Sequence, residues 1–508
     1  MTGDGPPDCA TSAFRFMRWL YHELPGTGNS GRIAGYEGGI AMPIVPKDFT
    51  IGLLVTALLE DRYNKTGHIR DQARAIAKRY AEKLAPFGAV VDPGFFESEA
   101  DAVRAARVLK AAEVDCVVIV EIAYQKGLIP LRALREIDAP LIVWNAQLVD
   151  EFPEGADFDL IMVNSGMCGL PELTSALLRA DRDFFLVTGS IDDRKALELL
   201  GAHLRAAKAA ARLRNAKVGL IGTSYEGMTD MMQDNLAVLE AFGATCWPVM
   251  PDEITDAFGQ VADADATRLI QEQKRLGRTI EVDDAMMRRS ARLALALERV
   301  VRAGGYDAVA QFDQIWLSEE RIGVIPFFGS SLMVEGHVPF ACEGDVMRAL
   351  SMLLLEELAG HSTFLEHYIL DYSRNLMFNS HDGHGNPGLA DPAHGVRIVP
   401  TIYYKGVHGF GASYNYSYRP GEVTLFSIGN TGSGRFHFVS SQGEFQAMTP
   451  RDISAPQTFF RWEGGSVTDF SERWLSGAPS HHHAAAYGKL NGVLAAAARM
   501  IGVGAVSI

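Results

Sequence analysis

Two hydrophobic patterns alternate along the first two thirds of the chain. Uncharged apolar runs, such as residues 49–59 and 139–147, are typical of strands buried on both faces of a parallel sheet. In other segments, such as residues 70–88, apolar residues recur every three or four positions, which predicts amphipathic helices. Further strands are predicted at residues 89–94, 116–122, 245–250 and 306–313, and further helices at residues 99–115, 130–138, 193–215, 235–244 and 283–305.

Strands that alternate with helices predict parallel sheets with right-handed crossovers, and a second cycle starts near residue 216. Beyond about residue 390, short aromatic and β-branched runs separated by Gly, Pro and Asn predict antiparallel strands in a barrel or sandwich. A terminal helix is predicted at residues 484–502. The predicted fold class is α/β, with two Rossmann-like parallel-sheet domains followed by an antiparallel β-barrel domain with a terminal helix, at residues 1–185, 186–360 and 361–508.

Composition and charge narrow the possible functions. Of the 508 residues, 47% are hydrophobic and 21% are charged, as in soluble multidomain proteins. The net charge of −15 argues against nucleic acid as a partner. We expect no membrane segment, because no apolar run of about 18 residues occurs, and residues 1–12 lack a signal-peptide pattern. The five cysteines are scattered, which indicates reduced packing residues and a cytoplasmic location.

One stretch, residues 340–350, places two acids around a glycine immediately before a predicted helix. Asp345 fits a helix N-cap, where its carboxylate would accept hydrogen bonds from the free backbone amides of the first turn. Glu343 lies two residues too early for that role and is therefore a candidate for chemistry. By contrast, the loop at residues 219–224 has neither GxGxxG nor GxxxxGKS spacing, so a nucleotide site is not expected there.

Carboxylates and imidazoles that suit a hard divalent ion gather in the last third of the chain. The candidate metal ligands are Glu343, Glu366, His381 and one of His481, His482 and His483, with Asp371 as an alternative to Glu366. Each group also has a simpler explanation. Glu366 would then be a solvated helix residue, His381 a turn residue, and the triplet a helix cap with exposed imidazoles.

Taken together, these segments resemble the L-arabinose isomerase and L-fucose isomerase superfamily of metal-dependent aldose–ketose isomerases. Residues 139–147 are similar to the family strand that ends in a substrate-facing Gln, here Gln147, and residues 218–230 resemble the loop with a substrate-facing Met, here Met228. The likeness extends from about residue 50 to the end. The other segments that carry it are Glu343-Gly344-Asp345, Phe364-Leu365-Glu366, Asn375, Ser380-His381-Asp382-Gly383, and Trp474 followed by Gly477-Ala478-Pro479-Ser480 and the histidines.

The resemblance implies an intramolecular oxidoreductase that interconverts an arabinose- or fucose-like aldose and its ketose through a metal-stabilised enediolate. Glu343 and Glu366 would be the acid–base pair and also metal ligands, with His381 and His482 completing the metal shell. The implied cofactor is Mn²⁺, or Mg²⁺ or Co²⁺, and the implied assembly is a homo-oligomer, a trimer or hexamer. Alternatives are a metal-dependent epimerase or lyase that acts on a related sugar or sugar acid, and a non-catalytic sugar-binding protein.

Overall fold

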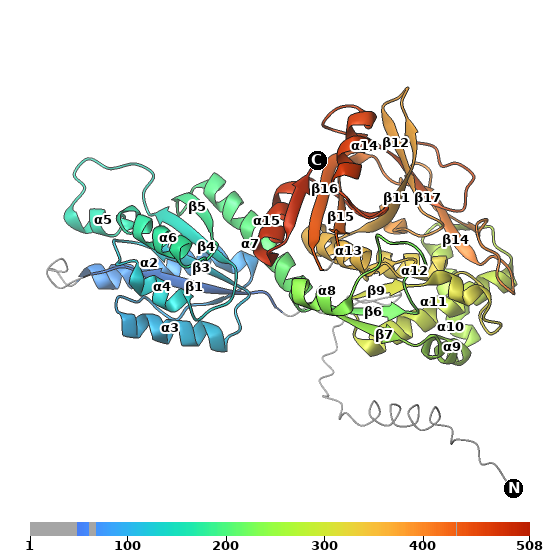
Figure 1. The fold of residues 1–508 in the computed structure, drawn as a ribbon, viewed down its shortest axis with the longest axis horizontal. Helices are drawn as coiled ribbons and strands as arrows, with labels where there is room; N and C mark the ends of the chain where they lie inside the picture. The colour runs from blue at the N-terminus through green and yellow to red at the C-terminus, as the bar shows by residue number, and fades with distance from the viewer. Residues whose placement is uncertain (1–47, 60–67, 433) are drawn as a thin grey trace, which may run out of the picture. The chain divides into compact units, whose positions relative to one another are not determined.

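The computed structural model describes residues 48–59, 68–432 and 434–508 (Figure 1). This part of the chain begins with parallel strands that are covered by helices. The first strands are β1 (Thr50–Thr56), β2 (Ala89–Val91), β3 (Cys116–Glu121), β4 (Leu141–Gln147) and β5 (Phe185–Ser190). They form a parallel sheet in the order β2-β1-β3-β4-β5. Residues 1–12, which the sequence predicts to lack a signal peptide, lie outside the described residues.

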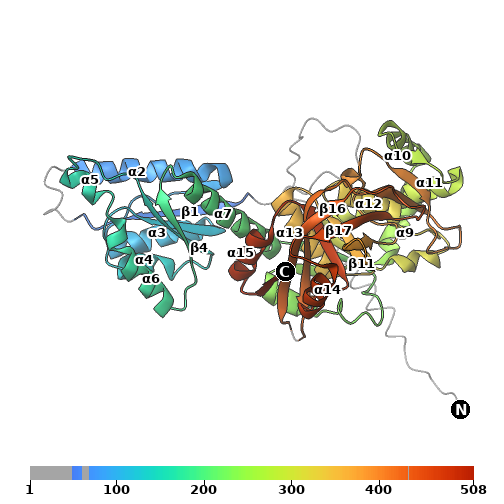
Figure 2. The same ribbon diagram turned by 90° about the horizontal axis from the view of Figure 1, so that it is seen from above.

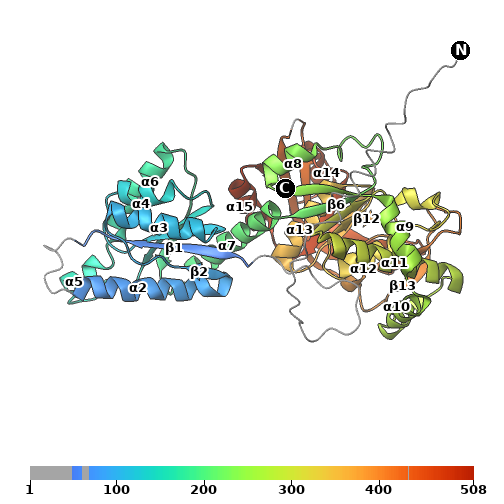
Figure 3. The same cartoon turned by 90° about the horizontal axis from the view of Figure 1, so that it is seen from below.

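Helices cover both faces of this first sheet. They are α2 (His68–Leu84), α3 (Glu99–Ala111), α4 (Leu128–Leu134), α5 (Phe158–Met162), α6 (Leu170–Arg179) and α7 (Arg194–Arg214). Figure 3 shows α2 on one side of β1, with α3, α4 and α6 on the other side. The apolar faces of the helices pack against the buried strand residues in two separate cores, as the predicted amphipathic periodicity requires.

A second parallel sheet has the strand order β10-β9-β6-β7. Its strands are β6 (Lys217–Ile221), β7 (Thr245–Val249), β9 (Ala308–Gln311) and β10 (Phe340–Ala341), and its helices are α8 (Asn235–Phe242), α9 (Pro251–Gln260), α10 (Asp263–Arg275), α11 (Asp284–Gly304), α12 (Phe327–Glu335) and α13 (Val346–Ala359). Every residue from Val346 to Leu355 is buried, and all of them except Arg348 and Ser351 are apolar, as expected for a helix enclosed by the core.

Six antiparallel strands form a closed barrel in the order β16-β15-β18-β11-β12-β17, because β16 also pairs with β17. Its strands are β11 (Thr363–Asp371), β12 (Leu376–Ser380), β15 (Gly421–Asn430), β16 (Phe436–Gln446), β17 (Pro456–Trp462) and β18 (His482–Tyr487). Helix α13 packs against β15 and β18, and Figure 2 shows this helix beside the barrel. The predicted fold class, two parallel α/β sheets followed by an antiparallel β-barrel, is therefore confirmed.

Shorter elements extend the barrel sheet and cover it. They are β8 (Thr279–Ile280), β13 (Arg397–Pro400), β14 (Ala412–Ser417), β19 (Gly504–Ser507), α14 (Val467–Ser476) and α15 (Asn491–Ile501). Strand β8 comes from the predicted middle domain but pairs with β13 of the predicted third domain. The domain boundaries at residues 185 and 360 stay predictions.

The predicted terminal helix starts too early. Residues 482–487 form β18, and the helix begins only at Asn491. The small residues of this segment lie between β11 and β15, so that backbone pairing to both neighbours overrides its alanine-rich helical propensity.

The cysteine prediction holds in part. Cys116 and Cys342 are buried and free, but Cys168 is exposed, so it is not a packing residue. Cys9 lies outside the described residues. Among the described residues, no helix is both long and apolar enough to cross a membrane.

Candidate active site

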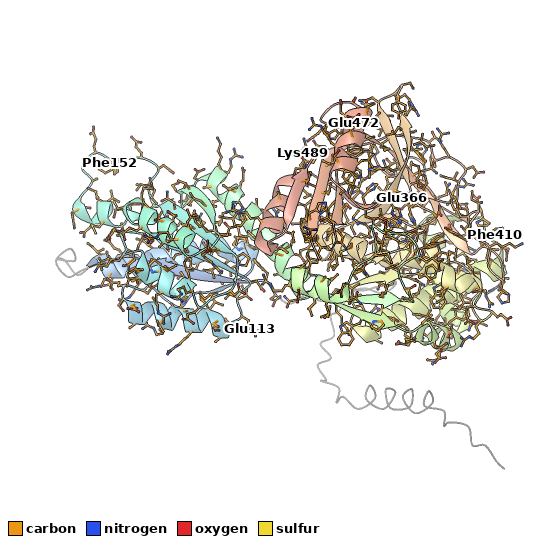
Figure 4. All side chains as sticks on the ribbon, in the orientation of Figure 1. Glu113, Phe152, Glu366, Phe410, Glu472 and Lys489 are labelled. Atoms are coloured by element: carbon orange, nitrogen blue, oxygen red, sulfur yellow. The ribbon has the colours of Figure 1, made fainter. Side chains whose placement is uncertain are left out.

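Three neighbouring barrel strands bring separated ligand candidates together. Glu366 of β11, labelled in Figure 4, pairs with Ser380 of β12 on one side and with His482 of β18 on the other. His381 directly follows the end of β12. The prediction that Glu366 could be a solvated helix residue is therefore wrong, because it lies in a strand. Register between strands, which no local pattern specifies, decides that these side chains meet.

The candidate ligand atoms lie within coordination reach of one another. Nε2 of His482 is 3.3 Å from Oε2 of Glu343 and 3.8 Å from Oε1 of Glu366. The rings of His381 and His482 have centroids 5.3 Å apart. One ligand atom each of Glu343, His381 and His482 can be chosen so that all lie within 4.8 Å, and the same holds for Glu366, His481 and His482.

Unpaired buried nitrogens test whether a cation fits this arrangement. Nε2 of His482 and Nδ1 of His381 are buried and have no hydrogen-bond partner. A buried polar atom without a partner is costly, and a neutral imidazole nitrogen can bind a metal through its lone pair. Two imidazoles with the carboxylates of Glu343 and Glu366 form a donor set that suits Mn²⁺ and related divalent ions. The residues therefore fit a divalent metal.

A strained turn at the carboxyl edge of the middle sheet positions Glu343. Its backbone φ is 58°, in the left-handed region that non-glycine residues rarely adopt. Its N–H donates to Oδ2 of Asp313 at 3.1 Å, and its carbonyl accepts from the amide of Tyr225 at 2.9 Å. The loops that follow β6, β9 and β10 thus meet at the carboxyl ends of parallel strands, where α/β sheets bind ligands.

Asp345 has two roles, of which the sequence revealed one. As predicted, its side chain caps α13 by accepting from the backbone amide of Arg348 at 2.9 Å. In addition, Oδ2 of Asp345 accepts a hydrogen bond from Nδ1 of His482 at 3.1 Å. This bond leaves Nε2 of His482 directed at Glu343, and it fixes the imidazole orientation as supporting residues do at metal centres.

The two histidines of the site have opposite pKa shifts. Burial and the neighbouring histidines hold the pKa of His381 well below its usual range. Burial also lowers the pKa of His482, but the neighbouring carboxylates of Asp345 and Glu343 outweigh it and raise that pKa to about 9. A cation that binds Nε2 of His482 must therefore displace a proton from this imidazole.

The three histidines do not all face the site. His481, just before β18, and His482, its first residue, both face Glu366, whereas His483 points to the other side of the strand. His481 donates from Nδ1 to Oδ2 of Asp230 at 2.6 Å and places Nε2 at 3.7 Å from Oε1 of Glu366. His482 lies between the predicted ligands, and His483 points away, stacked on His367 with ring centroids 4.1 Å apart. The expectation of a helix cap with exposed imidazoles is wrong, because His482 and His483 are buried strand residues.

Three further candidates are not among the converging side chains. The carboxylate of Asp371 forms an ion pair with Arg374 at the end of β11 and is not part of either ligand group. Gln147 is exposed at the end of β4, where its side-chain amide donates to the Val149 carbonyl at 2.8 Å. Met228 is half-buried in the loop after β6. Substrate contact by Gln147 and Met228 stays a prediction.

Two acids of the site were not found from the sequence. Asp313 is buried behind Glu343, and burial followed by the charge of Glu343 raises its pKa well above the usual range. Asp313 ends a predicted strand of a parallel sheet, and residues at the carboxyl ends of such strands commonly bind ligands. Its position in the sequence could therefore have identified it as a site residue. Asp230 supports His481, and the sequence offers no signal for that pairing.

Curated relatives of the chain are sugar isomerases, although no family model matches it. A sulfoquinovose isomerase of Alkalicoccus urumqiensis is 26% identical over 65% of this chain and 72% of that protein. An L-arabinose isomerase of Shouchella clausii is 22% identical over 74% of this chain and 78% of that protein. An L-arabinose isomerase of Mycolicibacterium smegmatis is also 22% identical, over 69% of this chain and 72% of that protein.

Proposed function

Because its curated relatives place the chain in the L-arabinose isomerase-like superfamily, we propose that it is a metal-dependent isomerase that interconverts an aldose and a ketose. The observation that carries this proposal is the convergence of Glu343, Glu366, His381 and His482 from four separate segments. Two of these side chains carry buried nitrogens without a hydrogen-bond partner. A sugar-binding protein without catalysis would need neither the buried imidazoles nor the paired carboxylates.

The reaction requires two proton movements. The hydrogen on C2 of the aldose leaves as a proton and is returned to C1, and the proton of the C2 hydroxyl passes to the oxygen on C1. Glu343 and Glu366 both lie within 4 Å of Nε2 of His482, so they border one small space. In this space one carboxylate can take the proton from C2 and the other can hold the hydroxyl proton.

The surrounding residues hold this pair in place. His381 and His482 would bind a divalent cation together with the two carboxylates, and the cation would draw electron density from the sugar oxygens and make the C2 proton easier to remove. The strained turn at Glu343 and the buried Asp345 keep the donor atoms oriented before any sugar binds. Burial also excludes water, so charges in this space interact more strongly than in solution.

The names of the relatives suggest the substrates to test first. We propose L-arabinose and other pentoses, 6-deoxyhexoses and sulfoquinovose as candidates, with Mn²⁺ as the first metal to supply. A homo-oligomeric assembly and a cytoplasmic location stay predictions.

Proton NMR in D₂O tests the function directly. We expect Mn²⁺-loaded protein to convert at least one candidate aldose to its ketose, while deuterium from the solvent enters at the transferred position. Glu343→Gln should lower turnover by at least about 100-fold, because it removes one member of the acid–base pair. Glu444→Gln, an exposed carboxylate on β16, is the matched control. If no aldose gives ketose or exchange, the proposed function is wrong.

A further inference from the structure

A β-bulge beside the predicted metal ligands redirects a tyrosine. The register of β11 against β12 shifts between His367 and Ile369, which leaves Tyr368 as the extra residue. A bulge breaks the strict alternation of a strand and can aim a side chain at a neighbouring site. Here the Tyr368 hydroxyl donates to Oδ1 of Asp382 at 3.4 Å and also faces the carboxylate of Glu366.

Asp382 is the second member of this pair. It follows His381 directly, but it belongs to neither group of side chains whose ligand atoms lie within 4.8 Å of one another. The hydroxyl of Tyr404 faces the same carboxylate. Asp382 therefore lies next to the predicted metal ligands, where its oxygens meet the hydroxyls of two tyrosines.

The pair combines polar groups with accessible aromatic surface. Tyr368 is 41% exposed and Tyr403 is 38% exposed, whereas His381 and His482 are buried. Sites for small polar molecules commonly combine aromatic surface with a few fixed hydrogen-bonding groups. A carboxylate accepts hydrogen bonds from hydroxyls, and a tyrosine hydroxyl can both donate and accept.

We propose that Asp382 and Tyr368 bind a hydroxyl group of the sugar other than those at C1 and C2, and so help to select the substrate. The identity of the ligand as a sugar rests on the proposed function. A site built to bond a hydroxyl strongly rejects an analogue that lacks it, because its polar groups are then left unpaired. The pair would thus act on substrate affinity and leave the metal shell intact.

Binding of sugar alcohols tests this inference without turnover. Isothermal titration calorimetry of Mn²⁺-loaded full-length protein with ribitol, xylitol, L-arabinitol and galactitol would identify the tightest probe. We expect Asp382→Ala and Tyr368→Phe each to weaken that probe, with a loss of about 10- to 100-fold for the bond to the charged carboxylate. Bound manganese per chain should stay at the wild-type value in both variants. Tyr372→Phe, 67% exposed and next to the end of β11, should bind the probe like wild type.

Three results would overturn the proposal. One is wild-type protein that binds none of the four alditols. Another is that both variants bind the probe as wild type does. A third is that Asp382→Ala loses its manganese, which would make this residue a metal ligand. Circular dichroism of each variant confirms that it is folded. Because alditols have no carbonyl to isomerise, alditol binding through this pair in a protein that isomerises no aldose would refute the proposed function alone.

Discussion

The carboxylate of Asp345 accepts a hydrogen bond from Nδ1 of His482 at 3.1 Å, across 137 positions of the chain. The same carboxylate caps α13 through the amide of Arg348 and is fully buried. One acid therefore starts a helix of the middle sheet and orients an imidazole of the barrel. This link predicts that metal affinity depends on a residue that need not touch the metal.

Asp345→Asn should separate these two roles. Asn caps a helix about as well as Asp, but it lacks the negative charge beside His482. We expect Mn²⁺ affinity, measured by competition with a chelating dye, to fall about 10- to 100-fold. The thermal midpoint should also fall, because Arg348 loses its buried partner at 3.5 Å. Asp283→Asn, at the exposed N-cap of α11, is the control, and an equal loss of affinity there would contradict the prediction.

Substitutions in the histidine triplet should have different effects, depending on the face of the strand on which the side chain lies. Loss of a residue that only supports a metal ligand can lower metal affinity by up to roughly 100-fold. We expect His482→Asn to lower the affinity for Mn²⁺ by well over this amount, because it removes a ligand. His483→Asn should keep Mn²⁺ but lower the thermal midpoint, because His483 is buried against His367 and Trp474. Metal analysis after dialysis, together with a thermal melt, checks both. Metal loss from His483→Asn with retention in His482→Asn would reverse the assignment.

Substitutions at two glycines with similar backbone angles can distinguish the cost of backbone strain from the cost of a steric clash. Gly344 and Gly360 have φ of 71° and 70°, but a Cβ on Gly344 would come within 2.2 Å of the Thr223 carbonyl oxygen, whereas nothing lies within 4 Å of one on Gly360. Gly360→Ala should therefore cost only about 1 kcal/mol of unfolding free energy. Gly344→Ala should lower the unfolding free energy by clearly more than this. It should also weaken the binding of Mn²⁺, since it displaces Glu343. Urea denaturation measures the difference, and equal losses would count against the clash.

Removal of metal should destabilise the protein. Glu343 and Glu366 both lie close to His482 and therefore to each other. A bound cation would balance the negative charges of these two carboxylates, and its removal takes this balance away. A ligand that binds only the folded state adds about 2.7 kcal/mol at 100 times its dissociation constant. We therefore expect chelation to lower the thermal midpoint, and added Mn²⁺ to restore it in a concentration-dependent way. A midpoint that does not respond to Mn²⁺ would argue against the site.

The buried carboxyl of Glu121 should make the stability of the protein depend on pH, independently of the metal site. It is 1% exposed, and neither carboxylate oxygen has a hydrogen-bond partner. Burial, followed by the charge of Glu172, raises its pKa from 4.5 to about 8. The folded state thus keeps a proton that the unfolded state loses. Stability should fall as pH rises from about 4.5 to about 8, by at most about 1.4 kcal/mol per pH unit, and then level off.

Glu121→Gln tests this slope. The amide cannot ionise, so the unfolding free energy from urea titrations should depend less on pH between 5 and 8 than in wild type. Glu82→Gln, an exposed carboxylate on α2, should keep the wild-type slope. Identical slopes in all three proteins would show that Glu121 is not protonated in the folded state.

From the sequence alone we could predict the α/β pattern, the antiparallel barrel, the cap at Asp345 and the residue types of the site. These follow from local periodicity, from capping chemistry and from the preferences of ligand atoms, which a short segment already contains.

Which side chains meet, by contrast, depends on how distant strands pair in the fold. The pairing of β11 with β12 and β18 brings Glu366 and His482 together, and the alternation along β18 turns His483 away. The same pairing overrides the helical propensity of residues 484–487. A strand takes its register from partners far away in the chain and from the core that they share, so no local pattern specifies it.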